Sequence, residues 1–358
     1  MTNTSSNIYS PYKVAHQLDK IASLRRGDPI WPTQVQIDLT NKCNHHCVYC
    51  FYRCARNEFL NATFNENDFI PFDYIKKLLS EFATYNIPTV QYTGGGEPLM
   101  HPNFYEIIDE TIRMGFEYAL VTNGSLIDLN SVDIFRHATW IRISLDAISE
   151  DIYAKSQGAD GQDMRHVINV IGALVSRCPN LTIGISFVVN PINWHEIVEA
   201  TRIARDLGVD NIRLSVAYTP RGIDLYENIW SEIETLAHRA KELETKHFKV
   251  FDLIAAHLEN LDLRQKGYSF CGYQHFTAVI GADLEIYPCC TLKYNSLSRL
   301  GNLKDESFYD IWLGNKRAEW LKRDHLKEVC DKNPCWMDKK NEFISYLIAQ
   351  DPPHKNYI

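Results

Sequence analysis

The stretch that decides the fold is VQIDLT at residues 35–40, followed directly by NKCNHHCVYC at residues 41–50. Apolar and polar residues alternate in the first part, which predicts a half-buried β-strand. The second part places the thiols of Cys43, Cys47 and Cys50 in the loop at the end of that strand. Three thiolates at this spacing are the right number to bind three irons of a 4Fe-4S cluster and to leave the fourth iron open to another ligand.

A structural zinc site is the alternative for the same cysteines, because zinc in proteins is commonly bound by four Cys or His ligands. Cys54, His45 or His46 would supply the fourth ligand. This motif by itself leaves both interpretations open.

The composition describes an ordinary soluble globular chain, with 358 residues of which 45% are hydrophobic and 23% charged. The formal net charge of -8 argues against a broad nucleic-acid-binding surface, since phosphate contacts need concentrated Lys and Arg. No apolar run suits a signal peptide or a membrane span. We therefore expect a cytoplasmic protein whose ten cysteines serve as metal ligands or reactive thiols rather than as disulfides.

Short β-rich runs alternate with amphipathic helical runs over residues 34–225. Such alternation predicts a parallel sheet with right-handed crossovers. The six expected strands are residues 35–40, 89–93, 118–122, 140–145, 181–189 and 211–216. We therefore expect an α/β protein with a (β/α)6 partial TIM barrel, whose chemistry lies at the carboxyl ends of its strands.

The remaining residues divide into three further parts. Residues 1–33 are polar and irregular, and we expect them to pack on the barrel as an N-terminal leader. Residues 226–266 are expected to form linking helices, with residues 229–247 as one long charged helix. Residues 267–358 are expected to form a small cysteine-rich C-terminal domain with a tail.

A second motif, TGGGEP at residues 93–98, ends the second expected strand. Glycines let the backbone approach a ligand closely, and an acid can pair with an ammonium group. A simple tight turn is the alternative for a glycine-rich run. Its position beside the three-cysteine loop favours a ligand site.

The sequence Cys43-x3-Cys47-x-Tyr49-Cys50, together with Gly94 to Glu97, resembles the signature of the radical S-adenosylmethionine (radical SAM) enzymes. The resemblance implies a partial barrel and a 4Fe-4S cluster whose open iron chelates the amino and carboxylate groups of SAM. It also implies reductive cleavage of SAM to methionine and a 5'-deoxyadenosyl radical, with the SAM amino group received by Gly95, Gly96 and Glu97.

Further candidate SAM contacts are implied at the ends of the other strands. They are Tyr49, Asn123, Ser144, Asp146, Ser186 and Arg213. Asn, Ser and Asp have the donors and acceptors to contact the SAM carboxylate and ribose. A turn at Asn123 and a helix cap at Asp146 are the structural alternatives, and Tyr49 is expected to pack on the cluster or on the adenine.

A second set of cysteines resembles the auxiliary-cluster extension called SPASM, or its shorter twitch form. The set comprises Cys271, Cys289, Cys290, Cys330 and Cys335. The chain departs from that pattern where Leu284 replaces the usual glycine, and the distal cysteines are reduced to Cys330-x4-Cys335. We expect one auxiliary 4Fe-4S cluster on Cys271, Cys289, Cys330 and Cys335, with zinc as the alternative. Whether Cys289 or Cys290 is the ligand is open, because adjacent side chains point apart on an extended backbone.

The expected protein is a radical SAM oxidoreductase or epimerase that dehydrogenates or epimerises a small molecule, such as a sugar or an aminocyclitol. Maturation of a ribosomal peptide is the alternative, and a non-catalytic iron–sulfur or zinc scaffold is the third. A low-potential electron donor such as flavodoxin or ferredoxin is the expected partner. Cys54 and Cys290 are candidate hydrogen donors for epimerisation, although a spare cysteine is more often a small buried hydrophobe.

Overall fold

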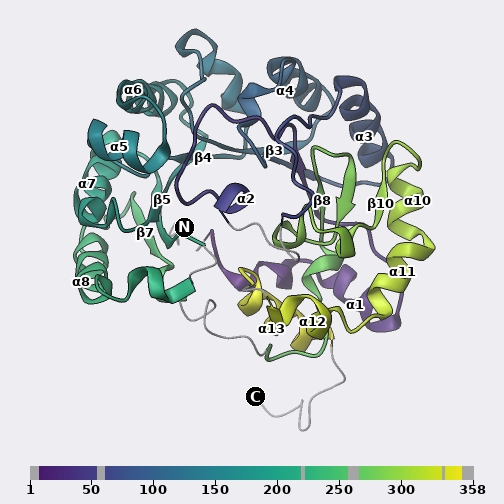
Figure 1. Cartoon of the computed structure of the whole chain (residues 1–358). Coiled ribbons are helices and arrows are strands. Elements are labelled where there is room, and N and C mark those ends of the chain that lie inside the picture. Colours follow the sequence, from purple (N-terminus) through teal and green to yellow (C-terminus); the bar gives the residue numbers. More distant parts are fainter. Residues whose placement is uncertain (1–7, 55–60, 219–221, 257–265, 333–334, 349–358) are drawn as a thin grey trace.

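The computed structural model describes residues 8–54, 61–218, 222–256, 266–332 and 335–348. The strands are β1 (Gln34–Asp38), β2 (Thr89–Thr93), β3 (Glu117–Thr122), β4 (Trp140–Ser144), β5 (Thr182–Val189), β6 (Asn211–Val216), β7 (Lys249–Asp252), β8 (Thr277–Ile280), β9 (Glu285–Tyr287) and β10 (Gly301–Asn302). They form one curved sheet in the order β10-β9-β8-β1-β2-β3-β4-β5-β6-β7, with helices on its outer side (Figure 1). The predicted partial barrel is confirmed.

Helices connect the strands and cover the sheet. Their bounds are α1 (Leu18–Arg26), α2 (Phe51–Cys54), α3 (Phe72–Thr84), α4 (Phe104–Arg113), α5 (Glu150–Gln157), α6 (Gly161–Arg177), α7 (Ile197–Leu207), α8 (Trp230–Lys241), α10 (Phe308–Leu313), α11 (Asn315–Lys322), α12 (His325–Glu328) and α13 (Asp338–Ile348). The amphipathic helices bury one face, as α4 does with Ile107 and Ile108, and so form the core between sheet and helices. None of the described helices is long and apolar enough to cross a membrane.

The structure differs from the prediction in the segment expected to consist only of linking helices. The single helix predicted over residues 229–247 is wrong, because α8 ends at Lys241 and β7 follows. β7 pairs in parallel with β6, with Arg213 opposite Phe251, and buries Val250. Val and Phe favour strands, and the edge of the sheet gives them an apolar surface that the sequence pattern does not reveal.

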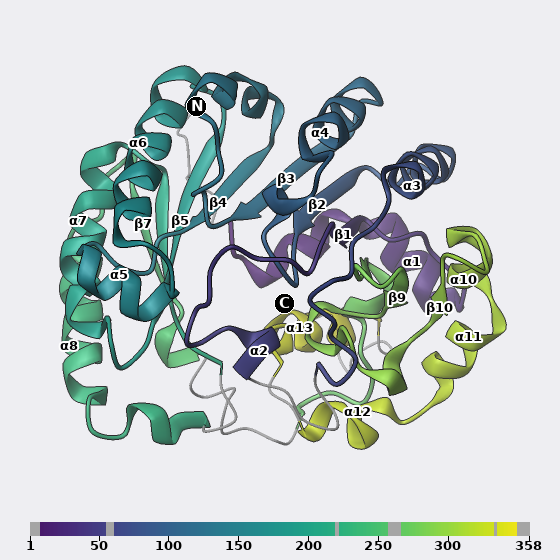
Figure 2. The same cartoon turned by 45° about the horizontal axis from the view of Figure 1, so that its top comes forward.

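The C-terminal residues extend the sheet of the barrel instead of standing apart from it. β8 pairs in parallel with β1 along its whole length, from Gln34 opposite Thr277 to Ile37 opposite Ile280. β9 and β10 then add antiparallel strands (Figure 2). Leu284, in the β8–β9 turn, has φ +66°, a backbone conformation that favours the glycine usual at this position. Its side chain is buried in the core, which offsets the strain.

The N-terminal segment packs at the amino-terminal end of the barrel strands. A short 3-10 helix, η1 (Pro11–His16), and α1 both contact α13. Tyr9 packs edge-on against Phe251 of β7, with ring centroids 4.7 Å apart. This segment therefore lines the bottom of the barrel interior.

A buried ion pair joins the C-terminal domain to the first strand. The ammonium of Lys293 donates to both carboxylate oxygens of Asp38, at 2.8 and 2.7 Å, and the hydroxyl of Tyr294 lies 2.9 Å from the same carboxylate. Asp38 and Lys293 are 0% and 1% exposed. Because neither charge reaches water, each depends on the other for its compensation.

We predict that Lys293→Met lowers the free energy of unfolding by about 3–5 kcal/mol, because the carboxylate of Asp38 is then left buried without its cation. Urea denaturation of the full-length protein measures the loss. Lys327→Met is the matched control, since Lys327 pairs with Asp324 at the surface, and it should change stability by less than about 0.5 kcal/mol. A Lys293→Met protein as stable as the control would show that the pair is not required.

Candidate functional site

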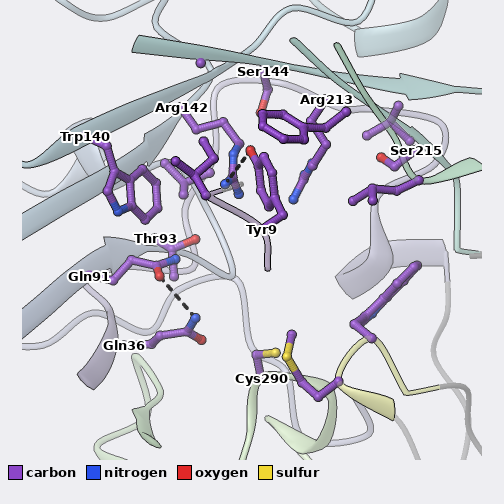
Figure 3. A pocket seen from close by; sticks show the side chains of 18 of the residues that line it. Tyr9, Gln36, Gln91, Thr93, Trp140, Arg142, Ser144, Arg213, Ser215 and Cys290 are labelled. Carbon is purple, nitrogen blue, oxygen red and sulfur yellow. Dashed lines mark hydrogen bonds between the residues drawn. The ribbon is translucent and has the colours of Figure 1, made fainter. Parts of the chain in front are cut away.

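The three-cysteine loop lies at the carboxyl end of β1 and opens on a large cavity. The cavity has a volume of 1890 Å³, and its lining includes Cys43, Cys47 and Cys50. It runs down the inside of the barrel, where Gln91, from β2, is one of the polar side chains that line it (Figure 3). The predicted position of the thiols at the catalytic end of a barrel agrees with this arrangement.

Backbone contacts with the glycine-rich motif hold the loop on one side. The N–H of Gly96 donates to the carbonyl of Thr40 at 3.0 Å, and that of Glu97 to the carbonyl of Lys42 at 2.8 Å. A Cβ on Gly95 would lie 2.1 Å from Oδ1 of Asn41, and one on Gly96 would lie 2.0 Å from the carbonyl oxygen of Lys42. These glycines are therefore required for close contact with the cysteine loop itself, a reason that the sequence did not reveal.

The end of α5 holds the loop on the other side, which sequence reasoning missed. The N–H groups of His46 and Val48 each donate, at 3.0 Å, to carbonyls of Gln157 and Ser156. Gly158 follows with φ +58°, and a Cβ there would lie 2.4 Å from the carbonyl oxygen of His46. Gly158 directly follows α5, but a glycine in the sequence does not say which loop approaches it.

Glu97 is buried at the centre of this arrangement. Its Oε1 accepts hydrogen bonds from the hydroxyl of Thr122 at 2.6 Å and the N–H of Leu99 at 3.2 Å, and its Oε2 accepts one from the N–H of Asn123 at 2.7 Å. Burial raises the pKa of Glu97 to about 7. No cation pairs with this carboxyl among the described residues, so a ligand ammonium would be its natural partner.

The aromatic residue before the last cysteine is tied to the end of β4. The hydroxyl of Tyr49 donates to Asp146 at 2.5 Å, and the other oxygen of Asp146 accepts the N–H of Val188, also at 2.5 Å. The amide of Asn123 donates to Asn44 of the cysteine loop at 2.9 Å. Asn123 and Asp146 thus brace the loop and line the cavity at the same time.

The two candidates on β5 and β6 lie deeper in the barrel than the cysteine loop. Arg213 donates to the hydroxyl of Ser186 at 2.8 Å, and only Arg213 of this pair lines the cavity. Beside it stands Arg142 of β4, which sequence reasoning missed because alternation along a strand does not say which strands face each other (Figure 3). Ser144 lies two residues after Arg142 on β4, on the same face of the strand, and also lines the cavity.

The two candidate hydrogen donors lie in different surroundings. Cys54 is exposed on α2, its thiol donates to the carbonyl of Val48 at 3.1 Å, and it is absent from the described lining of the cavity. Cys290 lines the cavity, as Figure 3 shows. The structure therefore brings only Cys290 toward the interior of the barrel.

The remaining cysteines of the second set gather around Cys289. The pKa of the Cys289 thiol is raised by burial and then by the neighbouring thiols of Cys290, Cys330, Cys335 and Cys271. The backbone of Cys289 is extended, with φ -159° and ψ 167°, so the side chains of Cys289 and Cys290 point to opposite sides. Cys289 therefore faces the other thiols, and Cys290 faces the cavity.

The family comparisons identify the class of protein. Residues 37–204 match the model of the radical SAM superfamily, and residues 271–336 match the SPASM model, an iron–sulfur cluster-binding domain. The chain belongs to the radical SAM superfamily and carries a C-terminal SPASM domain.

Relatives of known name align with most of the chain. A "tungsten-containing aldehyde ferredoxin oxidoreductase cofactor-modifying protein" of Pyrococcus furiosus is 23% identical, over 82% of this chain and 85% of its own length. An "AdoMet-dependent heme synthase" of Methanosarcina barkeri is 24% identical, over 84% and 87%. Streptococcus suis SuiB, solved with S-adenosylmethionine, has a TM-score of 0.65 at 15% identity, over 93% of this chain and 80% of its own. This last similarity shows the shared fold.

The residues present fit the cofactors of this family, which are SAM and 4Fe-4S clusters. Three soft thiols face a cavity that also contains a buried acid without a cation, and a second set of thiols gathers behind the cavity wall. Among the described residues, no three His, Cys, Asp or Glu side chains are arranged to hold a single ion. The family match, and not this geometry, decides between iron–sulfur and the zinc alternative.

We predict that Cys289→Ala lowers the iron content from about eight to about four per chain, because it removes a ligand of the second cluster. Cys290→Ala is the matched control at the adjacent position and should keep about eight iron. Iron and sulfide analysis after anaerobic reconstitution measures both. Loss of iron in the Cys290→Ala protein with full iron in the Cys289→Ala protein would reverse the assignment of the ligand.

Proposed function

We propose that the chain is a radical SAM enzyme that takes a hydrogen atom from a small molecule bound inside the barrel. One observation carries the proposal: a single cavity of 1890 Å³ is lined both by the cysteine loop and by polar side chains of the barrel strands. When bound, the cluster and SAM supply a 5'-deoxyadenosyl radical that abstracts hydrogen. The barrel walls hold the reacting molecules in one space and limit access of water to it.

In this proposal the chain's own residues share the work of binding. Cys43, Cys47 and Cys50 would hold the first cluster. Gly95, Gly96 and Glu97 would receive the SAM amino group, for which the cation-free carboxyl of Glu97 is suited. Asn123, Ser144 and Asp146, together with Tyr49 and Ser186, are the proposed remaining SAM contacts or their supports. Cys271, Cys289, Cys330 and Cys335 would hold the auxiliary cluster.

A small-molecule substrate is supported by the named relatives that align with more than four fifths of the chain. Their names refer to a cofactor and to heme rather than to a protein. The sugar or aminocyclitol class expected from the sequence stays a prediction. Dehydrogenation would use the auxiliary cluster as electron acceptor, whereas epimerisation would use a thiol such as that of Cys290 as hydrogen donor.

Peptide maturation is the second candidate, because the similar SuiB has also been solved with its precursor peptide SuiA, with a TM-score of 0.61 to this chain. Both candidates need an external low-potential electron donor of flavodoxin or ferredoxin type. Both also suit the cytoplasm, where thiols stay reduced.

We predict that the anaerobically reconstituted protein forms 5'-deoxyadenosine from SAM when a strong reductant is added. Replacement of Cys43, Cys47 or Cys50 by Ala should abolish this product, because the cluster loses a ligand. Cys178→Ala, a substitution in the core outside the cavity lining, is the control and should retain it. Chromatography of the quenched reaction measures the product, and its absence from the fully loaded wild-type protein would contradict the proposal.

We predict that the low-molecular-weight fraction of a cell extract stimulates formation of 5'-deoxyadenosine, because the bound substrate completes the site. Digestion of that fraction with a protease before the assay should leave the stimulation unchanged. Loss of stimulation after digestion would favour the peptide candidate instead.

A further inference from the structure

The cavity is positively charged although the whole protein is negative. The chain has a formal net charge of -8, yet the described lining of the cavity contains seven Lys and Arg and three Asp and Glu. A positively charged cavity in a negatively charged protein attracts anions and raises their local concentration.

The three acids of the lining already have other partners. The carboxylates of Glu97 and Asp146 accept the hydrogen bonds described above, and that of Asp252 accepts the N–H of Ile254 at 3.0 Å. None of them lies within ion-pair distance of a lining cation among the described residues. The acids of the cavity therefore leave most of its positive charge uncompensated.

Three of the cations form no ion pair with an acid among the described residues, are shielded from solvent in part, and lie near one another. They are Arg142, Arg213 and Lys340. Of the other four, Arg53 pairs with Glu66 at 3.1 Å, Lys241 pairs with Glu244 at 2.7 Å, and Lys13 and Lys339 are exposed. The three form one group, because the charge of Arg142 acts on both Arg213 and Lys340.

Strand register brings the two guanidinium groups together. Arg142 of β4 lies opposite Gly184 of β5, and Arg213 of β6 lies opposite Ser186 of the same strand. The residues of β5 that lie between the two arginines, Gly184 and Ser186, are therefore both small. The guanidinium of Arg142 donates to the hydroxyl of Tyr9 at 2.9 Å, and both guanidiniums lie over the Tyr9 ring, at 5.2 and 5.9 Å from its centroid (Figure 3).

In the absence of a ligand, the burial of these cations and the repulsion between them are unfavourable. Burial, and then the charge of Arg142, lower the pKa of Arg213 to about 9. The pKa of Lys340 is lowered by burial and by the charges of Lys13 and Arg142. The Nε of Arg213 is buried and has no hydrogen-bond partner among the described residues. A bound anion would supply both the missing charge and the missing acceptor.

Resting on the function proposed above, we propose that Arg142, Arg213 and Lys340 bind an anionic substrate, with the two arginines holding its carboxylate or phosphate group. Guanidinium groups match either oxyanion with paired hydrogen bonds. Arg142 is the middle residue of β4 and Arg213 lies in the amino-terminal half of β6, whereas the cysteine loop lies at the carboxyl ends of the strands. Arg213, one of the SAM contacts expected from the sequence, donates to Ser186, so the anion site borders the proposed SAM contacts. An aminocyclitol would bring its ammonium into this positive field, and the site therefore favours acidic small molecules.

The test measures anion binding without turnover. Pyrophosphate and citrate are titrated into the full-length reconstituted protein by calorimetry at matched ionic strength, for wild type, Arg142→Gln/Arg213→Gln and Arg113→Gln. We expect the double variant to bind the tighter probe about tenfold or more weakly, since it loses charged hydrogen bonds. Arg113→Gln, an exposed substitution paired with Glu110, should bind as wild type does. The probe that binds more tightly distinguishes phosphate from carboxylate.

Two further measurements separate this role from a structural one. Without a ligand, the double variant should melt at the same temperature as wild type or higher, because it removes the repulsion between the two guanidinium groups and Gln can still donate a hydrogen bond at each position. Arg142→Lys/Arg213→Lys keeps both positive charges but loses the paired N–H donors of the guanidinium groups, and it should bind the anions with intermediate affinity.

Four results would overturn the proposal: neither probe binds to the wild type, the double variant binds the probes as well as wild type does, the ligand-free double variant melts at a lower temperature, or SAM affinity falls by the same factor as anion affinity. The last would assign the arginines to the SAM carboxylate. Failure of SAM cleavage would contradict the proposed function but would leave this binding result standing.

Discussion

The arrangement of both cysteine sets depends on the buried pair of Asp38 and Lys293. It joins the last residue of β1, directly before the cysteine loop, to the C-terminal domain, with both side chains excluded from water. Tyr294 extends the contact, since its hydroxyl lies 2.7 Å from Oδ1 of Asn41. That same oxygen occupies the space where Gly95 would carry a Cβ. The C-terminal domain, the cysteine loop and the glycine motif are thus held by one connected set of contacts, which is stable only when all its polar atoms are paired.

Acidic and basic side chains lie in different parts of the barrel. The acids near the cysteine loop, Glu97 and Asp146, are buried and accept hydrogen bonds from backbone and hydroxyl donors, so they help to fix the loop. The cations lie further down the barrel, grouped around Tyr9. A zwitterionic cofactor at one end and an anionic substrate at the other would each meet the opposite charge, which orients them relative to each other before any reaction takes place.

Cys289 and Cys290 connect the auxiliary site to the cavity through a single peptide bond. The extended backbone at Cys289 sends one thiol to each side, one toward Cys271, Cys330 and Cys335 and the other into the barrel. A proposed ligand of the auxiliary cluster and a candidate hydrogen donor are therefore neighbours in sequence with different surroundings. Either outcome for the substrate radical, loss of an electron or gain of a hydrogen atom, would occur at this part of the wall.

The sequence by itself determined the class of the protein, because the cysteine spacing, the Gly94–Glu97 motif and the alternation of strands and helices are local patterns read along the chain. It also indicated five of the six predicted strands nearly to the residue. Only the tertiary structure decided that β7 and β8 extend the sheet, that Cys290 rather than Cys54 faces the cavity, and that Arg142 joins Arg213. These depend on which strands are neighbours and which side of each faces inward, and pairing between residues far apart in the chain leaves no local pattern.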